Sequence, residues 1–536
     1  MSSTDLQKLP ATLHALLDSC AIEAPNRPFI LNDGRWWTFK ELQHYSRMVA
    51  RQLASLGVKA GDHVVVMMPT SERYLAFWFA ISRLGAVEVP INGAYKGEVL
   101  EHVLRTAAPS IAVVASEHRH VFDRACNDIL QPSQVHDPQD YAFAWSDTTI
   151  DGASDTAAIG DATSAESPAS IIFTSGTTGV SKGVVSSHHQ QMCFGHFFRE
   201  IVKFSEDDVA YNFLPFFHIA AKFQTIGAML ARGRMMLRTA FSLSAFWDDV
   251  RASEATLCVA VGGLCNMLHG QPERTDDAYN SLRLIYAVPM PWAFKETFER
   301  RFDLQLVEAY GATESNLVLY TRLGEATPAG TCGRANPAFE ITIRDAQGAI
   351  LPLEEVGEIC IRPRHPNTIM SGYLGLADAT ADAVRGGYFH SGDNGYMNED
   401  GFIFFLDRSK DSIRRRGENI SSYEVERALN AHHDVAEVAV IPIKADIGED
   451  ELKATVVIRP GSNLRHQAFL EYAFNNLPYF MVPRFIEFRE QLPRTDTMKV
   501  RKVDLRRDGI TPDTWDCERN GLRVTRRGIE KIEFTR

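Results

Sequence analysis

SPASIIFTSGTTGVSKGVVSSHH, residues 167–189, is the stretch that decides the fold of this chain. Its apolar run at 171–173 is typical of a buried strand, and Thr174 to Gly179 then place two glycines, three threonines and a serine together. The chain has 36 glycines in 536 residues, an ordinary content, so the clustering is local. Backbone N–H groups, hydroxyls and the Lys182 ammonium all favour oxyanions. The segment therefore predicts a strand followed by a polyphosphate-binding loop.

This loop differs from a Walker loop in its spacing. Gly176 is followed by Gly179 and Lys182 without the Gly-Lys-Ser/Thr ending. A flexible Gly/Ser/Thr turn between strands is the competing interpretation, and the lysine at a fixed distance behind a strand favours the phosphate site. The expected phosphate-side residues are Thr174, Ser175, Gly176, Thr177, Thr178, Gly179 and Lys182.

The sequence on either side of the loop predicts an α/β fold. TFKELQHYSRMVARQLASLG, residues 38–57, has apolar residues at helical spacing, and DHVVVMMP at 62–69 follows as a β-branched run. Helices alternating with apolar strands imply parallel-rich sheets covered by helices. At 536 residues more than one domain is expected. The stretch 131–169 is rich in small polar residues and predicts surface loop.

A change of pattern at LDRSKD, residues 406–411, marks the expected domain boundary. SYEVERALNAHHDVAEVAVIPIK at 422–444 is typical of a helix followed by a buried strand. We therefore predict a large N-terminal domain at 1–408, with sheets flanked by helices. A small hinged α+β domain at 410–536 follows a short polar connection.

Composition and charge exclude some classes of partner. A net charge of −12 gives no general attraction to nucleic acid or to an anionic membrane. The eight cysteines are scattered without a CxxC pair, which favours buried reduced thiols and a cytoplasmic location. No window reaches the ~18 uninterrupted apolar residues that a membrane span needs. A monomer or homodimer without a membrane span is expected.

Further motifs follow the loop in a fixed order: LPFFHIAAK (214–222), VEAYGATES (307–315), YFHSGDNGY (388–396), RRRGENISSYEVE (414–426) and QLPRTDTMKVRKVDLR (491–506). Together with the loop they resemble the adenylate-forming superfamily of acyl-CoA synthetases, luciferases and peptide-synthetase adenylation domains, across almost the whole chain. The resemblance implies that ATP, with Mg²⁺, converts a small-molecule carboxylic acid into an acyl-adenylate. Transfer of the acyl group to CoA would follow.

The resemblance assigns roles to residues of the first two of these motifs. His218 would lie between the acyl pocket and the phosphates and move between the half-reactions, although a lone histidine among apolar residues is more often a core residue. Tyr310 would stack on adenine, with Gly311 beside it, and Thr313 would contact the phosphate region. Glu314 would hold Mg²⁺, which prefers carboxylate and phosphate oxygens. A surface turn capped by the threonine and glutamate is the competing interpretation.

The motif at 388–396 implies that Asp393 accepts hydrogen bonds from the ribose hydroxyls. Arg408 is its expected ribose-side partner, and Lys410 matches the hinge position. In the next motif, Gly417 would let the backbone approach the pantetheine arm of CoA.

In the last motif, Lys499 is the expected adenylation lysine, bridging the carboxylate and the α-phosphate. Preorganised charge of this kind is typically worth on the order of 10²–10³ in rate. Met498 stands where the family has glycine, and this departure is compatible with a nucleotide-binding pseudoenzyme. The same motifs would also suit an adenylation enzyme that acylates a separate carrier protein, or a luciferase-like oxygenase.

The acid itself is left open by the sequence. LIYAVPMP (284–291) lacks the usual Gly-Gly-Ala-Pro adenine wall, which Ala287 would supply through its backbone. By resemblance the pocket is lined by segments 217–223, 261–264, 286–290 and 308–312, including Phe217, Lys222, Gly262 and Gly263. Lys222 either meets a second anionic or polar group of the substrate or points to solvent. FHIAAK and IGEDELKA are similar to carnitine-CoA ligase-like members, but a quaternary ammonium favours an aromatic cage or a carboxylate over a lysine.

Overall fold

The computed structural model describes residues 6–126, 128–141, 163–174, 181–261, 264–288, 290–292, 294–408, 412–444, 449–493, 500 and 502–532. Within these ranges no helix is both long enough and apolar enough to cross a membrane. The helices are α2 (Leu13–Glu23), α3 (Phe39–Ser55), α4 (Glu72–Arg83), α5 (Gly97–Ala107), α6 (Ser116–Ala125), α7 (His188–Val202), α8 (Ile219–Ala231), α9 (Phe246–Ser253), α10 (Leu264–His269), α11 (Lys295–Phe302), α12 (Ala377–Ala383), α13 (Ser422–Asn430), α14 (His466–Asn476) and α15 (Lys502–Asp508).

Two seven-stranded, mostly parallel sheets form the large N-terminal part. The first has the order β13 (Gln305–Val307), β12 (Leu284–Val288), β11 (Leu257–Val261), β9 (Val209–Asn212), β10 (Arg234–Leu237), β1 (Pro28–Asn32) and β2 (Arg35–Thr38). The second has the order β19 (Gly372–Tyr373), β8 (Lys182–Ser187), β7 (Pro168–Thr174), β4 (Val87–Pro90), β3 (His63–Met67), β5 (Ile111–Val114) and β6 (Val135–His136). β6 and two short 3₁₀ turns, Pro132–Gln134 and Pro138–Asp140, lie where the sequence predicted only loop.

Local sequence explains where the helices of this part begin and how closely they pack. α3 begins with a capping box in which Thr38 and Glu41 each bond the backbone of the other. α7 and α8 approach closely, because a Cβ at Gly195 would lie 2.3 Å from the Ile226 side chain. Large apolar side chains of α4 and α7, such as Trp78, are buried in the main core.

A smaller β-rich layer carries several of the motif residues. Its three-stranded sheet consists of β14 (Ala309–Ala312), β15 (Asn316–Tyr320) and β16 (Arg334–Ala335). Its five-stranded sheet consists of β17 (Phe339–Arg344), β18 (Gly357–Pro363), β21 (Tyr388–Met397), β20 (Val384–Arg385) and β22 (Ile403–Arg408), the last paired with β21.

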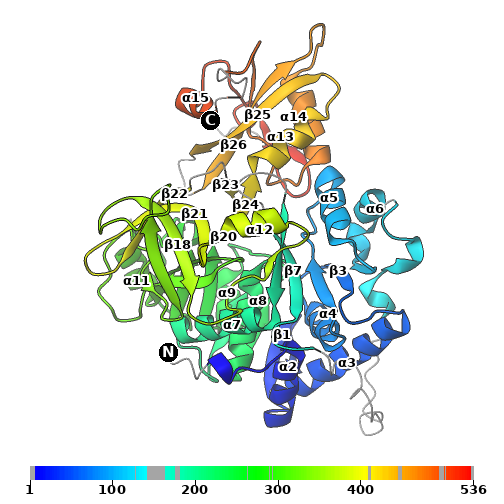
Figure 1. Cartoon of the computed structure of the whole chain (residues 1–536), viewed down its shortest axis with the longest axis vertical. Coiled ribbons are helices and arrows are strands. Elements are labelled where there is room, and N and C mark those ends of the chain that lie inside the picture. Colours follow the sequence, from blue (N-terminus) through cyan, green and yellow to red (C-terminus); the bar gives the residue numbers. More distant parts are fainter. Residues whose placement is uncertain are drawn as a thin grey trace.

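The C-terminal part has a core of its own. A hairpin of β23 (Ser412–Arg415) and β24 (Glu418–Ser421) precedes a sheet of β25 (Val435–Lys444), β26 (Asp450–Ile458), β27 (Phe485–Phe488) and β28 (Trp515–Asp516), and β29 (Leu522–Val524) pairs with β30 (Ile529–Lys531). Figure 1 shows this part at one end of the molecule, with α13 and α14 above α5. The α/β class with a large N-terminal and a smaller C-terminal domain is confirmed. The boundary at 408/410 stays a prediction.

Contacts join the small domain to the large one. Val99 of α5 packs into the apolar cluster of the small domain. The Lys96 ammonium donates to the Phe474 carbonyl of α14, and the Ser181 amide donates to the Glu424 carboxylate of α13. The segment that follows the glycine-rich loop therefore contacts the small domain directly.

Candidate active site

Tyr310 and Asp393 meet in a 2.6 Å hydrogen bond, which the tyrosine hydroxyl donates to Oδ2. Tyr310 lies on β14 and Asp393, a buried residue, on β21. The Phe405 ring packs beside Tyr310 with 6.2 Å between ring centroids. Arg408 is the strand partner of Asp393 across β21 and β22. The structure thus brings together the positions that the resemblance assigns to adenine and ribose.

Gly311 lies where the backbones of β14 and β15 approach closely. A Cβ at this position would lie 2.0 Å from the Asn316 carbonyl oxygen, so a larger residue would force the strands apart. Past this point, Gln190 of α7 donates from Nε2 to the Thr313 carbonyl at 2.9 Å. The turn that carries the acidic end of the motif is therefore fixed from two sides.

A second polar group forms around Glu314. Thr174, at the end of β7, donates from Oγ1 to Glu314 Oε1 at 3.1 Å, and the Tyr373 hydroxyl donates to the same oxygen at 3.3 Å. The Lys182 ammonium lies 4.8 Å from the centre of the Tyr373 ring. Carboxylate and hydroxyl oxygens are hard ligands that suit Mg²⁺, and the ammonium beside them suits phosphate.

The glycine-rich loop emerges directly from this group. Thr174 and Lys182 face each other across antiparallel β7 and β8, so the two ends of the loop are fixed at the same edge of the sheet. The remaining predicted loop residues lie outside the described part of the chain: Ser175, Gly176, Thr177, Thr178 and Gly179.

Sequence reasoning missed Tyr373 and Gln190. Tyr373 sits in a two-residue strand at the edge of the second sheet, where no motif marks it. Burial, followed by the nearby Glu314 carboxylate, raises the pKa of the Tyr373 hydroxyl, which therefore stays a hydrogen-bond donor. Gln190 lies in the polar stretch at the start of α7, and the sequence does not show that its side chain is buried.

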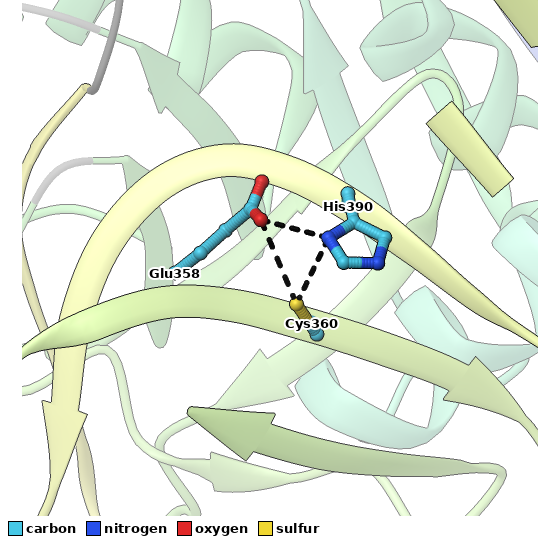
Figure 2. A group of neighbouring side chains, drawn as sticks. All are labelled: Glu358, Cys360 and His390. Carbon is cyan, nitrogen blue, oxygen red and sulfur yellow. Dashed lines mark hydrogen bonds and ion pairs between the residues drawn. The ribbon is translucent and has the colours of Figure 1, made fainter. Parts of the chain in front are cut away.

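Figure 2 shows a partly buried cluster of Glu358, Cys360 and His390 on β18 and β21, the strand that also carries Asp393. The Gly392 amide donates to Glu358 Oε1 at 3.0 Å, and His390 Nδ1 lies 2.7 Å from Glu358 Oε2. Cys360 Sγ is 3.4 Å from the same imidazole nitrogen. Although these three side chains are spaced as metal ligands can be, burial raises the pKa of Cys360 to about 12. We interpret the cluster as a hydrogen-bonded support.

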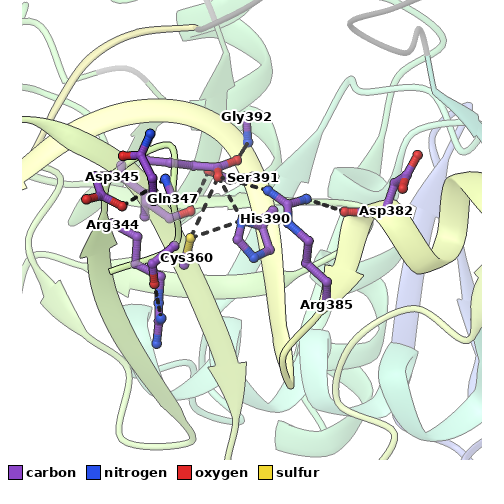
Figure 3. A network of polar contacts seen from close by, with 12 residues as sticks. Arg344, Asp345, Gln347, Cys360, Asp382, Arg385, His390, Ser391 and Gly392 are labelled. Carbon is purple, nitrogen blue, oxygen red and sulfur yellow. Dashed lines mark hydrogen bonds and ion pairs between the residues drawn. The ribbon is translucent and has the colours of Figure 1, made fainter. Parts of the chain in front are cut away.

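The same network extends through the turn before Asp393 (Figure 3). Ser391 donates from Oγ to the Ile359 carbonyl at 2.7 Å and accepts from the Asp393 amide at 3.1 Å. Gly392 has φ of +71°, a conformation that favours glycine. Arg385 lies 3.6 Å from the Glu358 carboxylate. Position and direction of the Asp393 carboxylate therefore depend on β18 as well as on its own strand.

His218 directly precedes α8 and contacts the small domain. Its Nε2 lies 3.1 Å from Glu418 Oε2, and 39% of its side chain is exposed, so it borders open space rather than the core. The neighbouring Gly417 has φ of +80°, and the space that a Cβ would fill there is empty. Its amide donates to Glu449 Oε2 at 3.1 Å. The predicted CoA-side glycine is thus adjacent to the residue that contacts His218.

Lys222 requires a correction, because its side chain is fully buried and does not point to solvent. Its ammonium lies 2.6 Å and 2.9 Å from the two oxygens of Glu88. The same carboxylate accepts 2.6 Å bonds from Tyr74 and Ser170, and the Trp78 ring centre is 4.2 Å from the ammonium. The charge is already paired inside the core, so an anionic substrate group is not needed to satisfy it.

The other predicted positions are only partly described. Phe217 is half-buried beside His218, with 4.7 Å between ring centroids. Ala287 is buried in β12, its side chain in an apolar cluster, which leaves only its backbone for an adenine wall. The following lie outside the described residues: Gly262, Gly263, Lys410, Lys499 and the side chain of Arg408.

Known proteins resemble this chain over most of its length. Residues 17–374 match the family described as AMP-binding enzyme, and residues 424–499 match its C-terminal domain. A crotonobetaine/carnitine–CoA ligase of Salmonella paratyphi B is 31% identical over 484 residues, which cover 88% of this chain and 93% of that protein.

Two solved structures of one enzyme share the fold. The o-succinylbenzoate CoA synthetase of Bacillus subtilis, as a double mutant bound with its product analogue OSB-NCoA, has a TM-score of 0.80 at 23% identity, covering 92% of this chain and 98% of that one. The structure of the same enzyme in complex with AMP has a TM-score of 0.66 at 23% identity. This match covers 90% of this chain and 96% of that one.

Proposed function

Since the chain belongs to the AMP-binding enzyme family, we propose that it is an ATP-dependent acid:CoA ligase. The first half-reaction joins a carboxylate to the α-phosphate of ATP, forming an acyl-adenylate and releasing pyrophosphate. The second transfers the acyl group to the thiol of CoA and releases AMP. The observation that carries the proposal is the convergence of the nucleoside pair Tyr310–Asp393 and the phosphate-side group around Glu314.

The first half-reaction needs the nucleotide held in line and its charge neutralised. A carboxylate is a poor electrophile, and adenylation gives it AMP as a leaving group. Asp393 would accept from the ribose while Tyr310 covers the base, and Lys182 would neutralise the phosphates. Lys499 would bring the carboxylate to the α-phosphate, a role that rests on the resemblance.

A magnesium ion fits the chemistry of the residues on the phosphate side. Glu314 and Thr174 would hold it with phosphate oxygens as further ligands, and when bound it stabilises the charge of the departing pyrophosphate. Tyr373 keeps the Glu314 carboxylate directed at this point through its own hydrogen bond.

The second half-reaction is supported by the position of the small domain. Glu418 contacts His218, and a Cβ at the neighbouring Gly417 would meet no other atom. The face of the small domain that carries Gly417 is therefore turned toward the acyl side of the site. The higher TM-score to the product-analogue complex than to the AMP complex of the same enzyme supports this assignment. We propose that the observed arrangement serves thioester formation and that rotation about Lys410 would exchange it for the adenylating one.

The acid is proposed from chemistry and from the relatives. Ligases named for crotonobetaine and carnitine share 31% identity with this chain, which makes a betaine acid the first candidate. The lysine that argued against a cationic substrate is neutralised by Glu88 in the core. The objection to a quaternary ammonium is thereby removed.

A screen for acid-dependent AMP formation tests the proposal. Purified enzyme, ATP, Mg²⁺ and CoA are supplied with acetate, medium-chain, aromatic, dicarboxylic or betaine acids, and AMP and acyl-CoA are quantified. The proposal predicts equal amounts of both products with a matching acid. AMP formation only with an added carrier protein would favour an enzyme that acylates such a carrier, and nucleotide binding without turnover of any acid would favour a pseudoenzyme.

A further inference from the structure

Tyr373 contacts the two oppositely charged side chains of the phosphate side. Its hydroxyl donates to Glu314 Oε1 at 3.3 Å, and the Lys182 ammonium lies 4.8 Å from the centre of its ring. The hydroxyl and the ring are different parts of one side chain, so each charge has a contact of its own. One tyrosine therefore holds both the residue assigned to the metal and the residue assigned to the phosphates.

The backbone segment that carries Tyr373 is bonded to the elements that carry both charges. The Met370 amide donates to the Glu314 carbonyl at 2.8 Å. The Leu374 amide donates at 2.8 Å to the carbonyl of Gly183, the residue that follows the lysine. Tyr373 itself lies in β19, which pairs with β8 at the edge of the second sheet. The ring is therefore mounted on a segment that joins the acidic turn to the strand of the lysine.

Lys182 is placed where its side chain could reach the Glu314 carboxylate. It lies directly opposite Thr174 in the pairing of β7 with β8, and residues opposite each other project from the same face of a sheet. The Thr174 hydroxyl contacts Glu314 Oε1 at 3.1 Å. A lysine has a flexible four-carbon stem, so its ammonium can move toward the same carboxylate. Attraction between the opposite charges favours that movement.

Within the described part of the chain, the Lys182 ammonium contacts the Tyr373 ring and forms no ion pair with a carboxylate. The face of an aromatic ring attracts a cation but accepts no charge-assisted hydrogen bond from it. A carboxylate would accept such a bond, and an incoming phosphate would have to break it. The ring therefore holds the ammonium in a way that leaves its positive charge available to a phosphate.

We propose that Tyr373 is a positioning residue that keeps the Lys182 ammonium apart from the Glu314 carboxylate, so that the lysine is available to ATP and the carboxylate to the metal. The inference rests on the proposed ligase function, which assigns both charges to the nucleotide. Without the ring, the two charges would pair with each other, and ATP would compete with Glu314 for the lysine. Loss of the ring should therefore weaken ATP binding even when no metal is present.

The test is a double-variant cycle on the binding of ATP in the presence of EDTA, measured by calorimetry. Tyr373→Leu should raise the Kd for ATP about five-fold, because Lys182 becomes paired with Glu314. Tyr373→Phe retains the ring and should leave that Kd within about two-fold of the wild-type value. Glu314→Gln removes a negative charge near the phosphates in any background. It should lower the Kd about five times more in Tyr373→Leu than in the wild type, since only there does it release the lysine.

Equal effects of Glu314→Gln in the two backgrounds, or equal losses in Tyr373→Phe and Tyr373→Leu, overturn the role of Tyr373 while the ligase function stands. Thermal unfolding checks that each variant is folded, and Tyr373→Met replaces the leucine variant if that one does not fold.

Lys182→Met tests the premise of the cycle. It should weaken the binding of ATP in EDTA at least as much as Tyr373→Leu does, and Glu314→Gln should not restore the loss beyond its effect in the wild type. Wild-type affinity in Lys182→Met would overturn the assignment of this lysine to the phosphates, and with it the proposal. Failure to form AMP from any acid of the panel overturns the ligase function instead, a result that the binding cycle does not affect.

Discussion

The imidazole of His218 in the large domain and the carboxylate of Glu418 in the small domain are 3.1 Å apart. They come from the segment before α8 and from the start of β24. A residue next to the predicted acyl pocket is thus bonded to the face that carries Gly417. This contact would exist only in one arrangement of the two domains, so it links domain position to the half-reaction in progress.

Replacing Glu418 with glutamine should slow the thioester step selectively. Loss of a partly exposed contact of this kind removes about 0.2–1 kcal/mol from the observed arrangement, so acyl-CoA formation from preformed acyl-adenylate should fall by a factor of about 1.4 to 5. Acid-dependent ATP–pyrophosphate exchange should be unchanged or faster. Glu471→Gln, in α14 of the same domain, is the control. Equal slowing of both half-reactions would contradict the assignment of this contact to the second step.

Gly417→Ala should impair transfer to CoA by more than its effect on folding explains. Its φ of +80° costs a non-glycine residue about 1–2 kcal/mol, and the methyl would enter the empty space where the pantetheine arm is expected. Gly461 in the same domain has φ of +84° and equally open surroundings, so Gly461→Ala reproduces the strain alone. Thioester formation and thermal unfolding should be measured for both. Equal thioester rates would remove Gly417 from the CoA path.

Glu358→Gln should weaken ATP binding without contacting the nucleotide. Removing a charged acceptor from Gly392 and His390 loosens the turn before Asp393, and hydrogen bonds to a charged group are worth about 1.5–3 kcal/mol. The KM for ATP should rise about ten-fold, with a smaller change in kcat. Cys360→Ser, which changes the neighbouring sulfur only, should have little effect. An unchanged KM for ATP in Glu358→Gln would show that β18 does not position Asp393.

Lys222→Met should destabilise the fold rather than alter the choice of acid. It leaves the Glu88 carboxylate buried without its partner, and breaking a buried pair typically costs about 3–5 kcal/mol. The double variant Glu88→Gln/Lys222→Met should recover much of the loss in urea unfolding. The ranking of acids should stay the same in all folded variants. A change in ranking with unchanged stability would return Lys222 to the acyl site.

Sequence patterns were sufficient where function lies in short contiguous motifs. Tyr310 and Asp393 could both be assigned to the nucleoside site from the sequence, because each lies in its own motif, although 83 positions separate them. Tyr373 could not, since a two-residue strand carries no periodicity, and its role follows from pairing with β8. Lys222, in α8, was misjudged because its partner Glu88 lies 134 positions away in β4.

Carboxylate activation through an adenylate is the central claim, and Lys499→Ala separates it from transfer to CoA. With a matching acid, the wild-type enzyme should catalyse acid-dependent ATP–pyrophosphate exchange. The exchange rate of the variant should be lower by a factor on the order of 10²–10³. The variant should still convert a chemically prepared acyl-adenylate and CoA into acyl-CoA. Exchange at the wild-type rate in the Lys499 variant, or no exchange by the wild-type enzyme with any acid, would contradict the account.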